Sequence, residues 1–256
     1  MAWDPALYSS FAQPRLRPAL DLLARIDVAP PRRVVDLGCG TGNVTRLLAQ
    51  RWPDAKVTGI DSSPEMLAAA ADGGAIHYNL GDMGSWTADH PVDVLFSNAA
   101  LHWLDDHARL FPRLFDQLAP GGVLAVQMPR NHHAPSHTLM AEAAAAGPWR
   151  GTLAPLLRRD PVADPAVYYD LLAPVAAGLD LWQTEYLHVL DGDDPVVRWT
   201  MSTALRPLLD ALEGEWRQGF LDAYTKLIAT AYPPQADGKT LLSFRRLFLV
   251  ARKAAA

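Results

Sequence analysis

The stretch "VVDLGCGTGNVT" (residues 34–45) decides the fold of this chain. A short β-branched run leads into a loop in which Gly38, Gly40 and Gly42 alternate with other residues, and residues 43–52 have helical spacing. A strand, a glycine-rich turn and a helix in this order are typical of the first unit of an open α/β sheet. Such a turn lies at the carboxyl edge of the sheet, where these folds bind ligands. The stretch therefore predicts a ligand-binding loop.

The rest of the chain continues the alternation of strands and helices. Ser62 or Ser63 is expected to cap a helix, and another helix is predicted over residues 108–122, closed by Pro120 and a glycine pair. After residue 129 the pattern becomes irregular and helical, with an alanine-rich helix at "AEAAAAG" and helical character again over residues 194–232. Alternating elements of this kind predict a doubly wound, parallel sheet. The strand candidates are residues 33–39, 56–61, 75–82, 92–99, 123–129, 179–190 and 241–253.

The composition argues against several classes of function. With a net charge of -5 over 256 residues, a nucleic-acid-binding face is not expected, although a few arginines in a pocket can still attract a small anion. The single cysteine, Cys39, excludes an intramolecular disulfide and a cysteine-rich metal site, and no metal is expected. No apolar run approaches the roughly 18 residues of a membrane span, and the N-terminus does not read as a signal peptide. We expect a cytoplasmic protein, and we assume a monomer because the sequence does not reveal the oligomeric state.

The spacing of the glycines helps to identify the ligand. The dinucleotide fingerprint is G-x-G-x-x-G, whereas this loop reads G-x-G-x-G, and Asp36 would be poorly placed beside a pyrophosphate. A cationic ligand would suit Asp36 directly or through water. Asp61, at the end of the second strand, fits a ribose diol, and Asp82, after the third, can accept a hydrogen bond from an adenine amine. Adenine, ribose and a cationic amino-acid tail without phosphate describe S-adenosylmethionine.

Four segments, "VVDLGCGTGN", "GIDSSPEML", "GDM" and "FSNAALHWL", resemble in this order the motifs of class I S-adenosylmethionine-dependent methyltransferases. The resemblance implies a Rossmann-like, doubly wound, seven-stranded and mostly parallel α/β sheet with helical insertions over the acceptor pocket. The alternative is that Asp61 merely caps a helix and Asp82 merely sits in a turn. The implied cofactor-binding residues are Asp36, Gly38, Gly40, Asn43, Asp61, Ser62, Asp82, Met83 and Asn98.

A narrower resemblance covers nearly the whole chain. The segments "WDPALY", "LHWLDDH", "GGVLAVQMP", "LRPLL" and "LLSFRRLFLVARK" are similar to those of the trans-aconitate 2-methyltransferase family. This resemblance implies methylation of a carboxylate of a small polycarboxylic acid, giving a monomethyl ester. We expect one methyltransferase domain over residues 1–256. Its expected parts are an N-terminal helical lid (1–30), a cofactor-binding core (31–129), two substrate-cap insertions (130–178 and 191–240) and a last strand (241–253).

A carboxylate acceptor needs no general base, because it is already ionised at neutral pH. It needs removal from water and alignment with the methyl group. We therefore expect three catalytic residues. Arg206 would bind a substrate carboxylate, His102 would donate a hydrogen bond to the substrate, and Trp103 would exclude water. Further substrate-contacting candidates are Tyr8, with Trp3 in the lid, and Arg246.

Each of these assignments has a plainer alternative. Arg206 can be a surface arginine and Trp103 can simply pack against the next helix. Arg245 and Arg246 must point to opposite faces of their strand, so at most one of them is expected to reach a ligand. The loop histidines, His132, His133 and His137, are expected to be solvated.

Other functions also stay open at this stage. The same enzyme class can act on another acid, such as an acyl-carrier-bound malonyl group or a specialised-metabolite carboxylate. A non-catalytic cofactor-binding module is a second alternative. A dehydrogenase is disfavoured by the glycine spacing.

Overall fold

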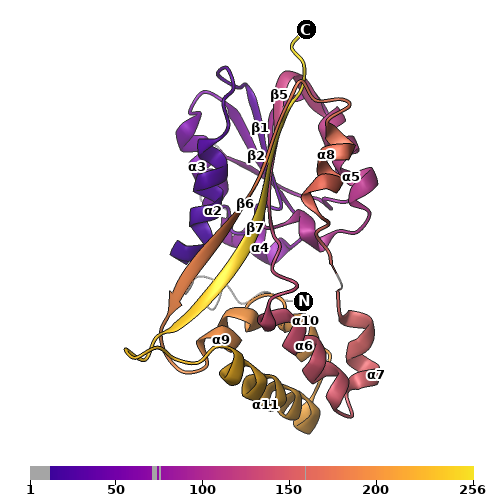
Figure 1. Cartoon of the computed structure of the whole chain (residues 1–256). Coiled ribbons are helices and arrows are strands. Elements are labelled where there is room, and N and C mark those ends of the chain that lie inside the picture. Colours follow the sequence, from indigo (N-terminus) through magenta and orange to yellow (C-terminus); the bar gives the residue numbers. More distant parts are fainter. Residues whose placement is uncertain (1–11, 71–73, 75, 159) are drawn as a thin grey trace.

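A single seven-stranded sheet runs through the computed structural model, which describes residues 12–70, 74, 76–158 and 160–256 (Figure 1). Its strand order is β3-β2-β1-β4-β5-β7-β6, and among the strands described β7 alone runs in the direction opposite to the others. The predicted Rossmann-like, mostly parallel sheet is therefore confirmed. The strands are β1 (Arg33–Leu37), β2 (Lys56–Asp61), β3 (His77–Leu80), β4 (Val92–Asn98), β5 (Leu118–Pro129), β6 (Gly178–Leu190) and β7 (Thr240–Arg252).

Helices cover both faces of the sheet, as the alternation of side chains along the strands requires. On one face, Val34, Val94 and Phe248 belong to a buried cluster that includes residues of α2 (Ala12–Ala24) and α3 (Asn43–Arg51). Their sequence neighbours point to the opposite face, toward α5 (His107–Asp116) and α8 (Pro165–Leu172). A further helix, α4 (Pro64–Ala70), connects β2 to β3.

The helix predicted over residues 108–122 is too long at its C-terminal end. The helix α5 ends at Asp116, and the Pro-Gly-Gly segment lies inside β5, which begins at Leu118 instead of residue 123. The register between β4 and β5 shifts between Val92 and Val94, and the Gly121 N–H donates to the Ala254 carbonyl. A bulge thus accommodates the glycine pair, which the local sequence pattern predicts to be a helix stop.

A second group of helices lies at one end of the sheet (Figure 1). We call it the helical body; it consists of α6 (Pro135–Ala146), α7 (Arg150–Leu153), η2 (Ala154–Leu156), α9 (Pro195–Met201), α10 (Arg206–Asp210) and α11 (Gly214–Ala231). Its members share a buried cluster whose large side chains include Trp149, Phe220 and Tyr224. The Tyr224 hydroxyl donates to the Ser136 carbonyl over 2.8 Å, joining α11 to α6. The alanine-rich segment is therefore a packed helix, as predicted.

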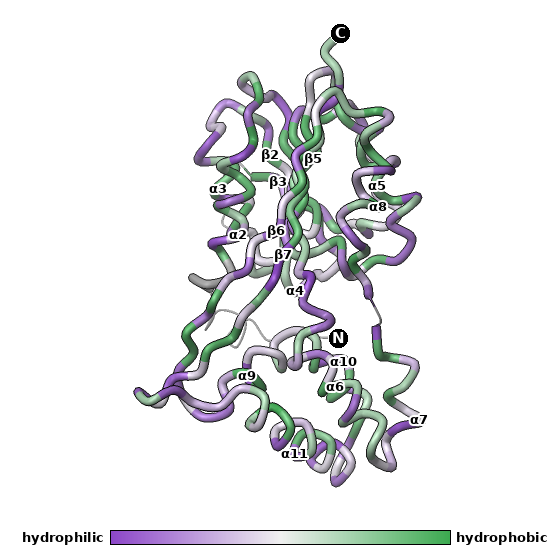
Figure 2. The backbone as a smooth tube through the Cα atoms, viewed as in Figure 1, coloured by the Kyte–Doolittle hydropathy of each residue, from purple (hydrophilic) through white to green (hydrophobic). Residues whose placement is uncertain are grey.

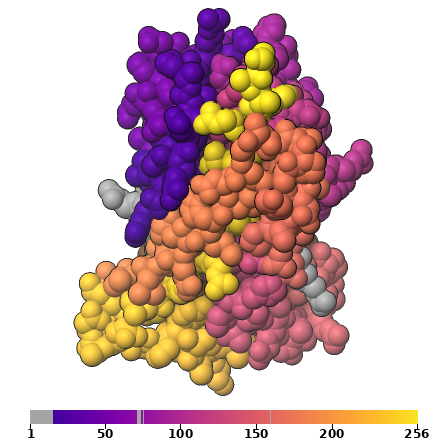
Figure 3. Space-filling view, turned by 45° about the horizontal axis from the view of Figure 1, so that its top comes forward, coloured from indigo at the N-terminus to yellow at the C-terminus, as the bar shows by residue number. Residues whose placement is uncertain are grey.

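Long strands connect the helical body to the sheet. The strands β6 and β7 pair from Gly178–Arg252 to Leu190–Thr240, and Leu190, Leu242 and Phe244 at their far ends belong to the core of the helical body. Figure 2 shows green, hydrophobic stretches in the strands around the β5 label, in the upper half of the molecule. Figure 3 shows the orange segment that contains β6 running across the front, from the sheet toward the gold part of the helical body.

The expected division into lid, core and cap insertions stays a prediction, but the positions of some segments are clear. Within the expected cap segment 130–178, α8 packs against α5 on the sheet and does not join the helical body. Within the expected lid, Leu22 and Ile26 are buried against the sheet, and Trp3 and Tyr8 lie outside the described residues. No helix in the described part of the chain is long and apolar enough to cross a membrane.

The contact between α8 and α5 generates a stability prediction. The Tyr168 hydroxyl donates to His107 Nδ1 over 2.7 Å and accepts from the Ala163 N–H over 3.1 Å, while His107 Nε2 donates to the Leu101 carbonyl. Replacing Tyr168 with Phe leaves two buried groups unsatisfied, so the free energy of unfolding should fall by about 1–3 kcal/mol.

Urea unfolding of Tyr168→Phe measures this loss. The neighbouring Tyr169 is 55% exposed and gives a matched control, because Tyr169→Phe should change stability by less than about 0.5 kcal/mol. Equal stability of the two variants would contradict the role assigned to the Tyr168 hydroxyl.

Candidate active site

The glycine loop between β1 and α3 is held by the neighbouring strand. The N–H groups of Gly38 and Cys39 both donate to the Ile60 carbonyl of β2, over 2.8 and 3.0 Å. At Gly38 the backbone φ is +82°, and an added Cβ would clash with Ala100 and lie 2.8 Å from the Met83 sulfur. Only glycine fits this combination of conformation and close approach. The loop is thereby pinned between the ends of β1, β2 and β4.

Asp36 points from β1 into the buried base of the loop. Its side chain is almost fully enclosed, and the Thr45 hydroxyl donates to Oδ2 over 2.7 Å. Burial raises the pKa of Asp36 from 3.8 to about 7; the Thr45 hydrogen bond opposes this shift and the nearby Asp61 charge adds to it. A cation placed beside Asp36 would favour its ionised form, so the site is suited to a positively charged group.

Asp61 lies at the carboxyl end of β2, facing the glycine loop. The Gly40 N–H donates to Oδ2 over 2.8 Å and the Ser63 N–H donates to Oδ1 over 2.9 Å. Each carboxylate oxygen keeps a further lone pair, so the group remains able to accept two hydrogen bonds from a diol. The Ser63 hydroxyl accepts from the Met66 N–H, which makes Ser63 the residue that caps α4, while Ser62 is exposed beside Asp61.

The remaining residues of the expected adenine and amino-acid contacts are held by local interactions. Asp82 follows β3 by two residues, and its carboxylate accepts from the Gly84 N–H and the Ser85 hydroxyl. These hydrogen bonds lower the pKa of Asp82, the Gly84 N–H contributing most. Asn43 begins α3, and its Oδ1 accepts from Arg46 over 2.7 Å. Both side chains are exposed, and their contacts with a cofactor stay a prediction.

The segment after β4 brings three predicted residues together. Asn98 ends the strand, and its Oδ1 is buried with no hydrogen-bond partner among the described residues. His102 lies in the following turn η1 (Leu101–Trp103), 4.8 Å from the Trp103 ring between centroids. Burial, followed by the nearby charges of His132 and Arg246, holds the pKa of His102 well below its ordinary value. His102 is therefore a neutral hydrogen-bonding group at neutral pH.

Arg246, not Arg245, points into the molecule. The Arg246 side chain is buried, its guanidinium lies 4.7 Å from the centroid of the Phe244 ring, and Nη1 donates to the Gln127 Oε1 over 3.4 Å. Arg245 is half exposed and pairs with Glu185 over 3.7 Å. The alternation expected for a strand is thus observed, with one arginine on each face.

Arg206 begins α10 in the helical body. It is partly buried, and its Nε lies 3.5 Å from the Asp210 carboxylate one turn later. Figure 1 places α10 on the side of the helical body that faces the sheet. An interaction of Arg206 with a substrate carboxylate stays a prediction, because the ion pair with Asp210 already accounts for an arginine at this position.

The loop histidines are not uniformly solvated, so that expectation is wrong for two of them. Only His133 is largely exposed, 3.0 Å from Asp160. His132 and His137 face each other with ring centroids 5.1 Å apart, and burial lowers their pKa values to about 4 and about 3. The loop turns inward because the Arg245 N–H donates to the Asn131 side chain. The two residues of this contact are more than one hundred positions apart in the sequence, so no local pattern predicts it.

Two further polar residues, which the sequence does not predict as site residues, belong to this region. Gln127 on β5 is fully buried, and Arg158 donates from Nη1 to the His102 carbonyl over 2.9 Å. Gln127 had one detectable signal, a polar residue inside an otherwise apolar strand. No group of three or more His, Cys, Asp or Glu side chains that could hold a metal occurs in the described parts of the chain.

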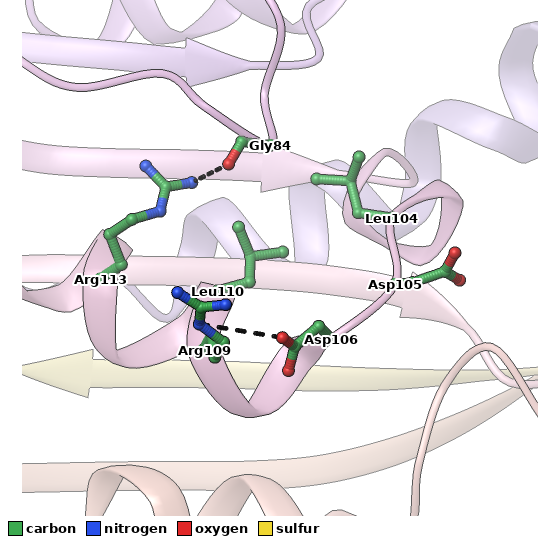
Figure 4. A pocket seen from close by; sticks show the side chains of 7 residues that line it. All are labelled: Gly84, Leu104, Asp105, Asp106, Arg109, Leu110 and Arg113. Carbon is green, nitrogen blue, oxygen red and sulfur yellow. Dashed lines mark hydrogen bonds and ion pairs between the residues drawn. The ribbon is translucent and has the colours of Figure 1, made fainter.

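A separate pocket of about 470 Å³ lies beside α5 (Figure 4). The Arg113 guanidinium donates to the Gly84 carbonyl, and Arg109 lies 3.9 Å from Asp106. None of the residues predicted for the cofactor or the acceptor lines it, so this pocket is separate from the candidate site at the carboxyl edge of the sheet. The lining residues are Gly84, Leu104, Asp105, Asp106, Arg109, Leu110 and Arg113.

Comparison with known proteins shows similarity to methyltransferases. Residues 34–122 match the family described as a methyltransferase domain. The chain is 52% identical to the trans-aconitate 2-methyltransferase of Methylobacterium radiotolerans over 98% of each chain, and 50% identical to that of Streptomyces coelicolor, over 98% of this chain and 86% of the relative. Among solved structures, phosphoethanolamine N-methyltransferase 2 of Haemonchus contortus, in complex with S-adenosylhomocysteine, has a TM-score of 0.56 at 17% identity. The alignment with it covers 93% of this chain and 52% of that one, and the likeness shows the fold alone.

The buried carboxyl of Asp36 predicts a pH dependence of stability. Because its pKa is about 7 in the folded protein and near 3.8 when unfolded, ionisation is penalised by about 4 kcal/mol in the folded state. The penalty is absent below pH 4, grows between pH 4 and 7, and is complete above pH 7. Asp36→Asn should therefore gain stability relative to the ligand-free wild type as the pH rises through this range.

Urea unfolding at several pH values between 4 and 8 measures the difference between the two proteins. Asp89→Asn, at an exposed position, supplies the control for charge removal and should track the wild type. A difference between Asp36→Asn and wild type that is constant with pH would contradict the raised pKa.

Proposed function

The chain belongs to the trans-aconitate 2-methyltransferase family, and from this premise we propose that it transfers the methyl group of S-adenosylmethionine to a carboxylate of trans-aconitate. The products are the monomethyl ester and S-adenosylhomocysteine. The relatives that carry this name are about half identical to the chain and align over nearly all of it. The observation in the molecule that carries the acceptor class is the buried Arg246 guanidinium at the end of the sheet.

The cofactor fits the charges at the edge of β1 and β2. In our proposal, Asp61 accepts hydrogen bonds from the ribose hydroxyls, while Asp36 faces the cationic amino-acid and sulfonium end. The open space around Gly40, where no atom lies within 4 Å of an added Cβ, admits the ligand next to the backbone. The further cofactor contacts that we propose are Gly38, Asn43, Ser62, Asp82, Met83 and Asn98.

The acceptor is proposed to lie between the end of β4 and β7. Methyl transfer to a carboxylate breaks the sulfur–methyl bond and forms an oxygen–methyl bond, and the sulfonium becomes a neutral thioether. No proton moves in this step, which agrees with a neutral His102 that donates or accepts a hydrogen bond but does not have to act as a base. Water must be kept from the carboxylate, because a hydrated carboxylate is a weak nucleophile.

Further residues complete the proposal for the acceptor. Trp103, in contact with His102, would limit the access of water. Arg206 would approach from α10 and bind a substrate carboxylate, and Tyr8, which lies outside the described residues, would contact the acceptor as part of a lid. We also propose a small anionic acceptor, no nucleic-acid partner, a monomer and a cytoplasmic location.

The proposal is tested by incubating the purified protein with S-adenosylmethionine carrying a labelled methyl group and with trans-aconitate. Labelled, base-labile methyl ester should accumulate with the concentration of acid. Turnover of another carboxylic acid at a kcat/KM higher by orders of magnitude would replace trans-aconitate as the acceptor. Binding of the cofactor without turnover of any acid would contradict the enzymatic function.

Asp61→Ala should weaken the binding of S-adenosylhomocysteine without unfolding the protein. Loss of each hydrogen bond to a charged group costs about 1.5–3 kcal/mol, so the Kd should rise at least tenfold. Calorimetric titration measures the effect. Asp54→Ala supplies the matched control, because Asp54 is exposed just before the opposite end of β2. An unchanged Kd for Asp61→Ala would remove Asp61 from the cofactor site.

A further inference from the structure

Four polar side chains follow one another on a single face of the sheet, near its carboxyl edge. Asp36 on β1, Asn98 on β4, Gln127 on β5 and Arg246 on β7 each lie an even number of residues from strand residues in the cluster beneath α2 and α3. Because side chains alternate along a strand, these four point to that same face. The strands β1, β4, β5 and β7 are direct neighbours, so the row is continuous across the sheet.

The register gives the spacing of this row. Asn98 pairs with Gln127, so their Cα atoms are separated by one strand spacing, roughly 5 Å. Arg246 pairs with Pro129, two residues beyond Gln127 toward the carboxyl edge. The row runs from a carboxyl at β1 to a guanidinium at β7, over three strand spacings or about 14 Å.

The orientation of the Gln127 amide is fixed by its neighbour. Arginine has only donors, so the group that faces Arg246 must be the amide oxygen, and the NH₂ group must point elsewhere. The residue is 0% exposed, and its Nε2 has no hydrogen-bond partner among the described residues. Buried amide donors are nearly always satisfied in folded proteins, so this donor indicates a ligand.

The signs of the charges along the row separate two ligands. Asp36, at one end, suits the cationic end of the cofactor, whereas Arg246, at the other end, suits an anion. An anion beside Arg246 would also lie within reach of the Gln127 NH₂ group, because the Arg246 guanidinium and the Gln127 amide are in contact. A carboxylate has two oxygens and can accept from both groups at once.

We propose that Gln127 is a specificity-determining residue that donates from Nε2 to a non-reacting carboxylate of the acceptor, beside Arg246. The inference rests on the proposed function, since it concerns the acid that receives the methyl group. It explains how the enzyme selects polycarboxylates. An acid with a single carboxylate could place it beside the Gln127 donor or beside the methyl group of the cofactor, but not at both positions.

Gln127→Met tests the proposal, because methionine has a similar length and no donor. The acceptor KM should rise about 10- to 100-fold with little change in kcat, because the contact is made equally in the ground state and the transition state. Gln127→Glu should raise the KM further, since the new carboxylate pairs with Arg246 and repels the acid. The Kd of S-adenosylhomocysteine should stay within twofold in both variants.

Two competitive inhibitors measure the specificity itself. Fumarate and crotonate have the same carbon skeleton, but crotonate has a methyl group in place of one carboxylate. The wild type should bind fumarate more tightly than crotonate, and the ratio of their inhibition constants should shrink at least tenfold in Gln127→Met. Unchanged ratios and an unchanged acceptor KM in both Gln127 variants would overturn the proposal.

Gln183→Met is the matched control. Gln183 also accepts from an arginine, Arg130, over 3.1 Å, but it is exposed on the edge strand β6. This variant should keep the wild-type KM and ratio. Melting curves with S-adenosylhomocysteine establish that each variant is folded, and loss of cofactor-dependent stabilisation in both Gln127 variants would contradict the proposal by assigning Gln127 to the structure alone.

Calorimetric binding of trans-aconitate to the S-adenosylhomocysteine complex separates this inference from the proposed function. A wild type that binds the acid without methylating it contradicts the proposed function, yet weaker binding by Gln127→Met still supports the role of Gln127. A wild type that neither binds nor methylates polycarboxylates overturns both.

Discussion

The close approach of the glycine loop to the end of β4 is the constraint on which the rest of the site depends. A side chain at Gly38 would clash with Ala100, so the loop can pass here only as bare backbone. In addition, the N–H groups of Gly38 and Cys39 both donate to the Ile60 carbonyl of β2. Three strand ends are thereby fixed relative to one another, and with them Asp36, Asp61 and Asn98. The backbone of the loop, together with the Asp61 carboxylate that accepts from the Gly40 N–H, therefore sets the geometry of the candidate cofactor site.

Two ionisable side chains of the candidate site are buried. Both Asp36 and Arg246 lie inside the protein, where an ion loses most of its hydration. Asp36 responds with a raised pKa, whereas an arginine cannot lose its proton and must be solvated by neighbouring groups such as the Gln127 amide and the Phe244 ring. Ligands of opposite charge at the two ends reduce both penalties. In the proposed function, the cofactor and the acid would supply these charges and so replace part of the hydration that folding removes.

The sequence predicts the sheet and the cofactor loop well because their signals are local. Every strand was found, and the chain order of Asp36, Asp61 and Asn98 follows directly from the strands that carry them. The errors occur where distant residues decide. The Pro-Gly-Gly segment has the local pattern of a helix stop, but pairing with β4 and with the C-terminal segment makes it part of a strand. His132 has the local pattern of a solvated loop residue, but the contact of Asn131 with β7 holds its loop inward. From the sequence, Gln127 is recognisable only as a polar residue within an apolar strand, because its hydrogen-bond partner, Arg246, lies 119 residues away.

The pair Arg245–Arg246 shows why the proposed acceptor site is harder to predict from the sequence than the glycine loop. Beyond this pair, β7 is buried on both faces, with Leu247 and Leu249 on one side and Phe248 on the other. A slip of one residue would exchange the two arginines while keeping apolar residues on both faces, so hydrophobic pattern alone cannot choose between them. The choice is made by backbone contacts: Arg245 exchanges hydrogen bonds with Arg130 and Asn131, which sets the register at the carboxyl edge. Which of the two arginines is buried is therefore determined by the tertiary structure.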